Sequence, residues 1–282
     1  MNTATTAAVS TRLAAGTAEG PQAGAALRVT QRRVLLSEWT KFRSLRSTVY
    51  TLLTAAALMI GLGALFSAIT AGPAGGFEPG TTATSTSLTG TFFAQLAVGV
   101  LGVLLISGEY STGMIRSSLT VVPRRLPMLW AKLAVFAVVI FLSALVAAFA
   151  SFLLGQAMLS GQHLDVALSD PGALRAVVGA ALYLTVAGMT AMALGGLLRN
   201  TAAAVTTFVA VFFVIPPLTN LLPTTLTSHF VQYLPSNAGA MMLDGSYGVV
   251  NPLSPWTGFA AMCAFAAILI GLAAWRLDRA DA

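Results

Sequence analysis

Six long apolar stretches, separated by polar segments, make up most of this sequence. Each is close to the 20 or so residues that an α-helix needs to cross a hydrocarbon layer of roughly 30 Å. Lys132 and Arg175, each near the edge of a stretch, are the charged residues within them. We therefore predict an all-α, polytopic bundle of six membrane-spanning helices, over residues 49–71, 88–107, 129–158, 173–198, 201–222 and 256–275.

The overall composition supports a membrane protein. Hydrophobic residues make up 56 % of the 282 residues and charged residues only 9 %, whereas soluble domains carry about 25 % charged residues. Much of the surface must therefore face lipid, which predicts a multi-pass protein of the cell membrane. Residues 1–28 contain few large apolar side chains and no signal-peptide core, so we expect a disordered cytoplasmic tail there and the helical domain over residues 29–282.

The basic residues predict the orientation of the bundle. Of the 15 Lys and Arg residues, all except Arg175 fall in the segments that would lie on one side of the membrane. Cytoplasmic segments carry the excess of Lys and Arg, so both termini are predicted to be cytoplasmic. The same bias explains the net charge of +6 without nucleic-acid binding, because no groove of alternating basic and aromatic residues accompanies it.

The polar segment before the first span has the pattern of a helix that lies in the membrane interface. Apolar residues recur at helical spacing up to the start of the span, and charged residues occupy the other faces. The alternative is an ordinary positively charged flank. We favour the interfacial helix and expect it to contain Arg32, Leu35, Glu38, Trp39, Lys41, Phe42 and Arg43.

The cytoplasmic connection between the second and third spans is far longer than a tight turn requires. Its first part continues the second span with a helical face, and Pro123 would then end that helix. A basic, helical loop of this kind suits docking to a soluble partner, whereas the alternative is a solvated loop that only enforces topology. The candidate docking residues are Glu109, Tyr110, Gly113, Arg116, Pro123, Arg124 and Arg125.

Residues 216–255 are rich in proline and contain two apolar runs too short to cross the membrane. We interpret Pro216 and Pro217 as an interruption of the fifth span, followed by a short external re-entrant segment that includes Tyr233 and Pro235. The alternative, a disordered external loop, conflicts with the apolar content. Residues 72–87 and 160–171 are predicted to be flexible external loops.

Motifs for catalysis or metal binding are missing from the sequence. It has no nucleotide-binding G-x-x-x-x-G-K-[ST] loop, and His163 and His229 have no Cys or carboxylate neighbours at metal-ligand spacing. We therefore expect no enzyme activity, no metal site and no cofactor bound by this chain. The spans also lack the Asp, Glu or His that ion-coupled carriers place within the bilayer.

A few polar residues do lie inside the predicted spans. For these, hydrogen bonding between helices, worth about 0.6 kcal/mol per bond on average, is the favoured role over contact with a substrate. They are Gln95, Gln156, Tyr183 and Asn220.

Three segments resemble those of type 2 ABC (ATP-binding-cassette) transporter permeases from actinobacteria. The first is Ser37–Thr48 before the first span, and the second is Glu109–Arg116 with Leu119–Arg125 and Lys132 after it. The third is Tyr233–Ser236 before the last span. The resemblance covers residues 31–276.

The resemblance implies a permease subunit of an ABC exporter, with an interfacial elbow helix at Arg32–Arg46 and a coupling loop at Glu109–Arg125. The loop would contact separate ABC ATPase subunits, which bind the ATP and Mg²⁺, and a second permease chain, identical or related, would complete the path. Within the loop, Glu109 and Arg116 are the candidates for orienting it. The alternative function is a non-transporting immunity or sensor protein of the same architecture. The sequence leaves the substrate open.

Overall fold

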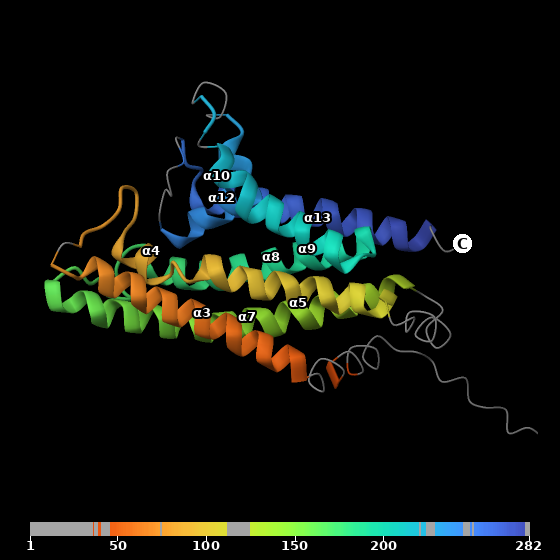
Figure 1. The fold of residues 1–282 in the computed structure, drawn as a ribbon, viewed down its shortest axis with the longest axis horizontal. Helices are drawn as coiled ribbons and strands as arrows, with labels where there is room; N and C mark the ends of the chain where they lie inside the picture. Colours follow the sequence, from red (N-terminus) through yellow and green to blue (C-terminus); the bar gives the residue numbers. More distant parts are fainter. Residues whose placement is uncertain are drawn as a thin grey trace, which may run out of the picture. The chain divides into compact units, whose positions relative to one another are not determined.

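The computed structural model is built from long helices that run alongside one another (Figure 1). It describes residues 36, 39–40, 46–73, 75–111, 125–219, 221–223, 229–244, 249 and 251–279, and this part of the chain contains no strand. Six of its helices are long and apolar enough to cross a membrane, which confirms the predicted all-α bundle. They span Arg46–Thr70, Thr91–Gly108, Leu126–Gln162, Ala173–Leu198, Thr201–Thr219 and Pro255–Arg279.

The long helices are α3 (Arg46–Thr70), α5 (Thr91–Ser111), α7 (Arg125–Leu159), α8 (Ala173–Leu198) and α13 (Pro255–Arg279), with α9 (Thr201–Val209) opening the fifth span. Because successive spans alternate in direction, the start of α3 and the end of α13 belong to the same side of the bundle. We call this side the cytoplasmic end, following the prediction from the basic residues, and the opposite side the external end.

Helix α8 is at the centre of the packing. Of its apolar stretch, 78 % of the residues are buried, against 22 % for α3 and 17 % for the span that starts with α9. It packs on α5, α7 and α13. Small side chains such as Ala176, Ala180, Ala187 and Ala191 form much of its buried surface, and they let the neighbouring helices approach closely.

The helices around α8 leave broad apolar faces uncovered. Helix α3 buries a single stripe that includes Ala55 and Met59, while Leu53 and Ile69 are 60 % and 59 % exposed. Such faces suit lipid, since acyl chains are as apolar as the side chains themselves.

The fifth span corrects one prediction, because Pro216 and Pro217 do not interrupt it. The helix passes from α9 into a π-helix, η2 (Ala210–Val214), and then into α10 (Ile215–Thr219). The amide of Ile215 donates to the carbonyl of Ala210, a bond one residue longer than in an α-helix. The prolines then fall in the first turn of α10, directly after the π-helix, and they supply no N–H to the carbonyls of the turn before them.

A second correction concerns residues 72–87, which were predicted to be a flexible loop. Residues 83–87 form a short helix, α4 (Ala83–Ser87), all of whose residues are buried. It packs against α3, α7 and α8 (Figure 1). Gly90, in the turn between α4 and α5, lies so close to α3 that a Cβ there would come 2.1 Å from the carbonyl oxygen of Met59. The segment is therefore an inserted part of the bundle.

The polar connection before the last span also folds back onto the bundle. It contains η3 (Val231–Tyr233), α12 (Pro235–Ala240) and η4 (Met241–Leu243). Helix α12 packs mainly against α13, and η4 packs against α8 and α13. Met241, Met242 and Leu243 are buried, as are most residues of α12, whereas Tyr233 is 57 % exposed. A re-entrant depth for this segment stays a prediction.

Candidate functional site

The residues predicted for the coupling loop lie where α5 ends and α7 begins. Glu109 and Tyr110 belong to the last turn of α5, and Arg125 is the first residue of α7. Their side chains, together with Gly113, Arg116, Pro123 and Arg124, lie outside the described residues. The structure thus describes the two helices that carry the loop and leaves its docking role a prediction.

The predicted elbow helix is described at three positions only. Leu36, Trp39 and Thr40 are helical, and the Thr40 hydroxyl donates to the Leu36 carbonyl at 2.8 Å. Leu36 and Trp39 are exposed, as expected for side chains that face lipid in the membrane interface. The other predicted members lie outside the described residues: Arg32, Leu35, Glu38, Lys41, Phe42 and Arg43.

Lys132 lies near the cytoplasmic end of α7. Of the charged residues that the structure describes, it is the one that is buried. The residue is only 7 % exposed, and Nζ lies 3.5 Å from the carbonyl oxygen of Leu105 in α5. Lys132 therefore bridges the two helices that lead into the predicted coupling loop.

Two further polar contacts tie helices together at this cytoplasmic end. The hydroxyl of Thr201, the first residue of α9, donates to the Ser107 hydroxyl of α5 at 2.8 Å. The guanidinium of Arg276 in α13 donates to the Leu197 carbonyl in the last turn of α8. A cation at the C-terminal end of a helix is also favoured by the helix dipole.

At the external end, three residues from separate segments meet. The guanidinium of Arg175, in the first turn of α8, forms an ion pair with the Asp244 carboxylate at 2.9 Å. The hydroxyl of Thr82, which caps the N-terminus of α4, donates to the Asp244 carbonyl at 2.9 Å and lies 3.4 Å from its carboxylate. We call Thr82, Arg175 and Asp244 the external cluster. Sequence analysis did not select them, although Arg175 was the single basic residue predicted to lie outside.

Helix α4 is held by hydrogen bonds from α7. The Ser151 hydroxyl lies within donating distance of two carbonyls, that of Ser87 at 2.7 Å and that of Met59 in α3 at 3.0 Å. The side-chain amide of Gln156 donates to the Ser87 hydroxyl at 2.8 Å and the Ala83 carbonyl at 3.2 Å. These partners satisfy polar groups that would be costly to bury alone in a membrane.

The polar residues predicted to join helices do so where they are described. The Tyr183 hydroxyl of α8 donates to the Gln95 side-chain oxygen of α5, and both residues are buried. The Tyr183 ring also contacts that of Phe92 edge to face, with ring centroids 6.3 Å apart. Gln156 bonds to α4 as given above, while Asn220 lies outside the described residues. Hydrogen bonding between helices is therefore confirmed for Gln95, Gln156 and Tyr183.

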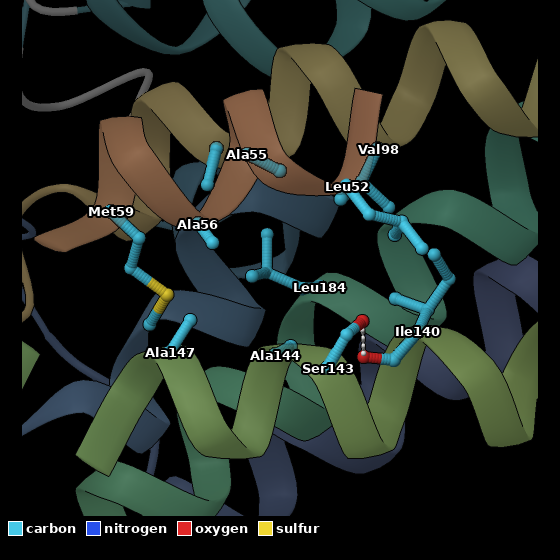
Figure 2. A pocket seen from close by; sticks show the side chains of 11 residues that line it. Leu52, Ala55, Ala56, Met59, Val98, Ile140, Ser143, Ala144, Ala147 and Leu184 are labelled. Atoms are coloured by element: carbon cyan, nitrogen blue, oxygen red, sulfur yellow. Dashed lines mark hydrogen bonds between the residues drawn. The ribbon is translucent and has the colours of Figure 1, made fainter. Parts of the chain in front are cut away.

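A small apolar pocket lies where α3, α5, α7 and α8 meet (Figure 2). Figure 2 shows Leu52 and Met59 of α3 facing Ile140 and Ala147 of α7. The one polar side chain in its lining, Ser143, donates to the Val139 carbonyl of its own helix at 2.8 Å. The cavity measures about 20 Å³, room for about one water-sized group. It is therefore a packing gap and too small to be a transport path.

The chemistry available in the described part of the chain is that of packing and hydrogen bonding. No group of three or more His, Cys, Asp or Glu residues that could hold a metal ion occurs within the described ranges. The site therefore offers two sets of polar contacts, one at each end of the bundle, that tie helices from distant parts of the sequence.

Comparison with known proteins adds a family. A family model described as "ABC-2 family transporter protein" matches residues 34–216, which is well over half of the chain and includes the first four spans and most of the fifth. Comparison with curated proteins found no match.

Proposed function

Because the chain belongs to the ABC-2 family of transporter proteins, we propose that it is the permease subunit of an exporter driven by a separate ATPase. Membership of the family makes the chain a membrane-spanning component of an ABC transporter in the cell membrane, one that works with an ATPase subunit. The proposal adds the outward direction, the coupling loop as the docking site, and a second permease chain.

The observation that carries the proposal is the composition of the spans. The six predicted spans contain no Asp or Glu, which are the groups that a proton- or sodium-coupled carrier needs in the bilayer. Lys132 is the buried charged residue among those that the structure describes, and its positive charge would repel protons and sodium ions. The energy for transport must then come from outside the chain, and ATP and Mg²⁺ bound by the partner ATPase supply it.

Docking of the ATPase is assigned to the loop over Glu109–Arg125. The contact between Lys132 and Leu105 supports this assignment, because it joins the helices on both sides of the loop. A push on the loop would therefore reach α5 and α7 together. The Ser107–Thr201 bond extends the connection to α9, the span that the protomer buries least and that offers surface to a second permease chain.

Affinity purification of the full chain from its native membrane tests the proposal. We expect an ATPase with a nucleotide-binding loop to co-purify, and we expect Glu109→Ala or Arg116→Ala to reduce its recovery severalfold. Arg279→Ala is the matched control, since Arg279 is cytoplasmic and exposed but lies on α13, where its guanidinium stacks on Trp275. Full recovery of the ATPase with both loop variants would disprove the docking assignment, and no ATPase with the wild-type chain would disprove the driven exporter.

A further inference from the structure

We propose that the external cluster of Thr82, Arg175 and Asp244 is a lock that holds the external end of the permease closed, and that it must open during each transport cycle. The inference rests on the proposed function. It assigns to these three residues a role in controlling access from outside, in addition to the cytoplasmic coupling loop.

The external cluster joins segments from distant parts of the chain. Thr82 begins α4, the short helix inserted before the second span, and Asp244 follows η4, the end of the segment inserted before the last span. Arg175 is in the first turn of α8, the most buried span. A single residue, Asp244, therefore contacts both the other inserted segment and the central helix of the bundle.

The ion pair between Arg175 and Asp244 offsets unfavourable electrostatics at Arg175. A cation in the first turn of a helix is disfavoured by the helix dipole. External segments are also depleted in basic residues. The position of Arg175 is therefore unfavourable for two separate reasons. The Asp244 carboxylate, 2.9 Å away, compensates both effects. Removing Asp244 would leave Arg175 without its ion-pair partner in the first turn of α8, and this favours separation of the two segments.

The backbone next to the ion pair leaves room for its two charged groups. Gly172, which precedes α8, has φ of +94°, and a Cβ there would come 3.1 Å from the Arg175 guanidinium and 3.2 Å from the Asp244 carboxylate. Asp244 itself has φ of +63° as the residue that ends η4, in the left-handed region that Asp adopts more readily than most residues. The absence of a side chain at Gly172 therefore leaves room for the two charged groups to meet.

The Arg175–Asp244 ion pair is partly exposed to water. The side chains of Arg175 and Asp244 are 32 % and 30 % exposed, in contrast to the fully buried bonds that hold α4 to α7. Ion pairs that water reaches are weak, each shifting an equilibrium by about fivefold at most. Such a pair can break and reform within a cycle, whereas the buried bonds around Ser151 and Gln156 keep α4 attached to α7.

The test measures access to α4 from outside. In a Cys263→Ser background, which removes the single native cysteine, Thr84→Cys places a thiol at a buried position of α4. The purified chain is placed alone in proteoliposomes and treated from the external side with a membrane-impermeant maleimide, without ATP, ATPase or substrate. Gly161→Cys, at an exposed position of the predicted external connection after α7, serves as the accessible reference for the reagent.

The lock predicts that Asp244→Asn raises the labelling rate at Thr84→Cys, by up to about fivefold, and leaves labelling at Gly161→Cys unchanged. Asp170→Asn is the matched control, because Asp170 is another external carboxylate, and it accepts from the nearby amide of Ala167. The charge exchange Arg175→Asp with Asp244→Arg restores slow labelling if the pair acts as an ion pair, and it separates loss of the lock from misfolding.

Two results would overturn the lock. One is a labelling rate at Thr84→Cys that Asp244→Asn leaves unchanged, and the other is fast labelling that the charge exchange fails to reverse. Labelling is read without ATP and without the ATPase, so its outcome is independent of whether the chain exports anything. A failed co-purification would instead count against the proposed function.

Discussion

At the scale of single residues, the bundle depends on a few polar side chains and on places where helices touch. Gln156 and Ser151 hold α4 through bonds to residues more than 60 positions away in the chain. Neither contact leaves a trace in the local sequence, where residues 81–91 are mostly Thr and Ser and have the composition of a loop. Arg175 was visible, as an exception to the charge bias, but its partner was not.

Gly90 gives a direct test of close packing. We expect Gly90→Ala to destabilise the protein by about 1–3 kcal/mol, the usual cost of overpacking, because its Cβ would collide with the Met59 backbone. Gly61→Ala is the control, since a Cβ at this exposed position of α3 meets nothing within 4 Å. Thermal unfolding of the two variants in the same detergent measures the difference. Equal melting temperatures would show that the turn at Gly90 and α3 do not touch.

At the scale of elements, the spans were predictable and the inserted segments were not. A span is recognised from about 20 apolar residues in a row, and this signal needs no knowledge of its partners. Helix α4 is polar, and it is stable in the interior only because α7 supplies hydrogen-bond partners. The fifth span was misjudged for another reason, since Pro216 and Pro217 would break an α-helix, and a preceding π-helix accommodates them.

The role of the prolines can be tested by replacing them with residues that carry a backbone N–H. Pro216→Ala with Pro217→Ala provides two N–H donors, and we expect the π-helix at Ala210–Val214 to convert to α-helix. Hydrogen exchange in this segment should then slow severalfold. Pro255→Ala is the control. Pro255 is the first residue of α13, so the N–H that the substitution adds has no helical carbonyl to bond. Unchanged exchange at Ala210–Val214 would mean that the π-helix has another cause.

At the scale of the whole molecule, polar contacts lie at both ends of the bundle, in addition to buried bonds inside it such as that between Gln95 and Tyr183. The cytoplasmic end has Lys132 between α5 and α7 and the Ser107–Thr201 bond to α9. The external end has the cluster of Thr82, Arg175 and Asp244. The pocket where α3, α5, α7 and α8 meet is lined mainly by apolar side chains and is too small for a path.

The most direct test of the account asks what drives the external end to open. The Thr84→Cys chain in the Cys263→Ser background is placed in proteoliposomes, alone or with its co-purified ATPase, and labelled from the external side. We predict that labelling accelerates only with the ATPase and hydrolysable ATP, and that a proton or sodium gradient has no effect on the chain alone. Acceleration by either gradient without the ATPase, or no response to ATP in the complex, would contradict a permease driven by a partner's ATP hydrolysis.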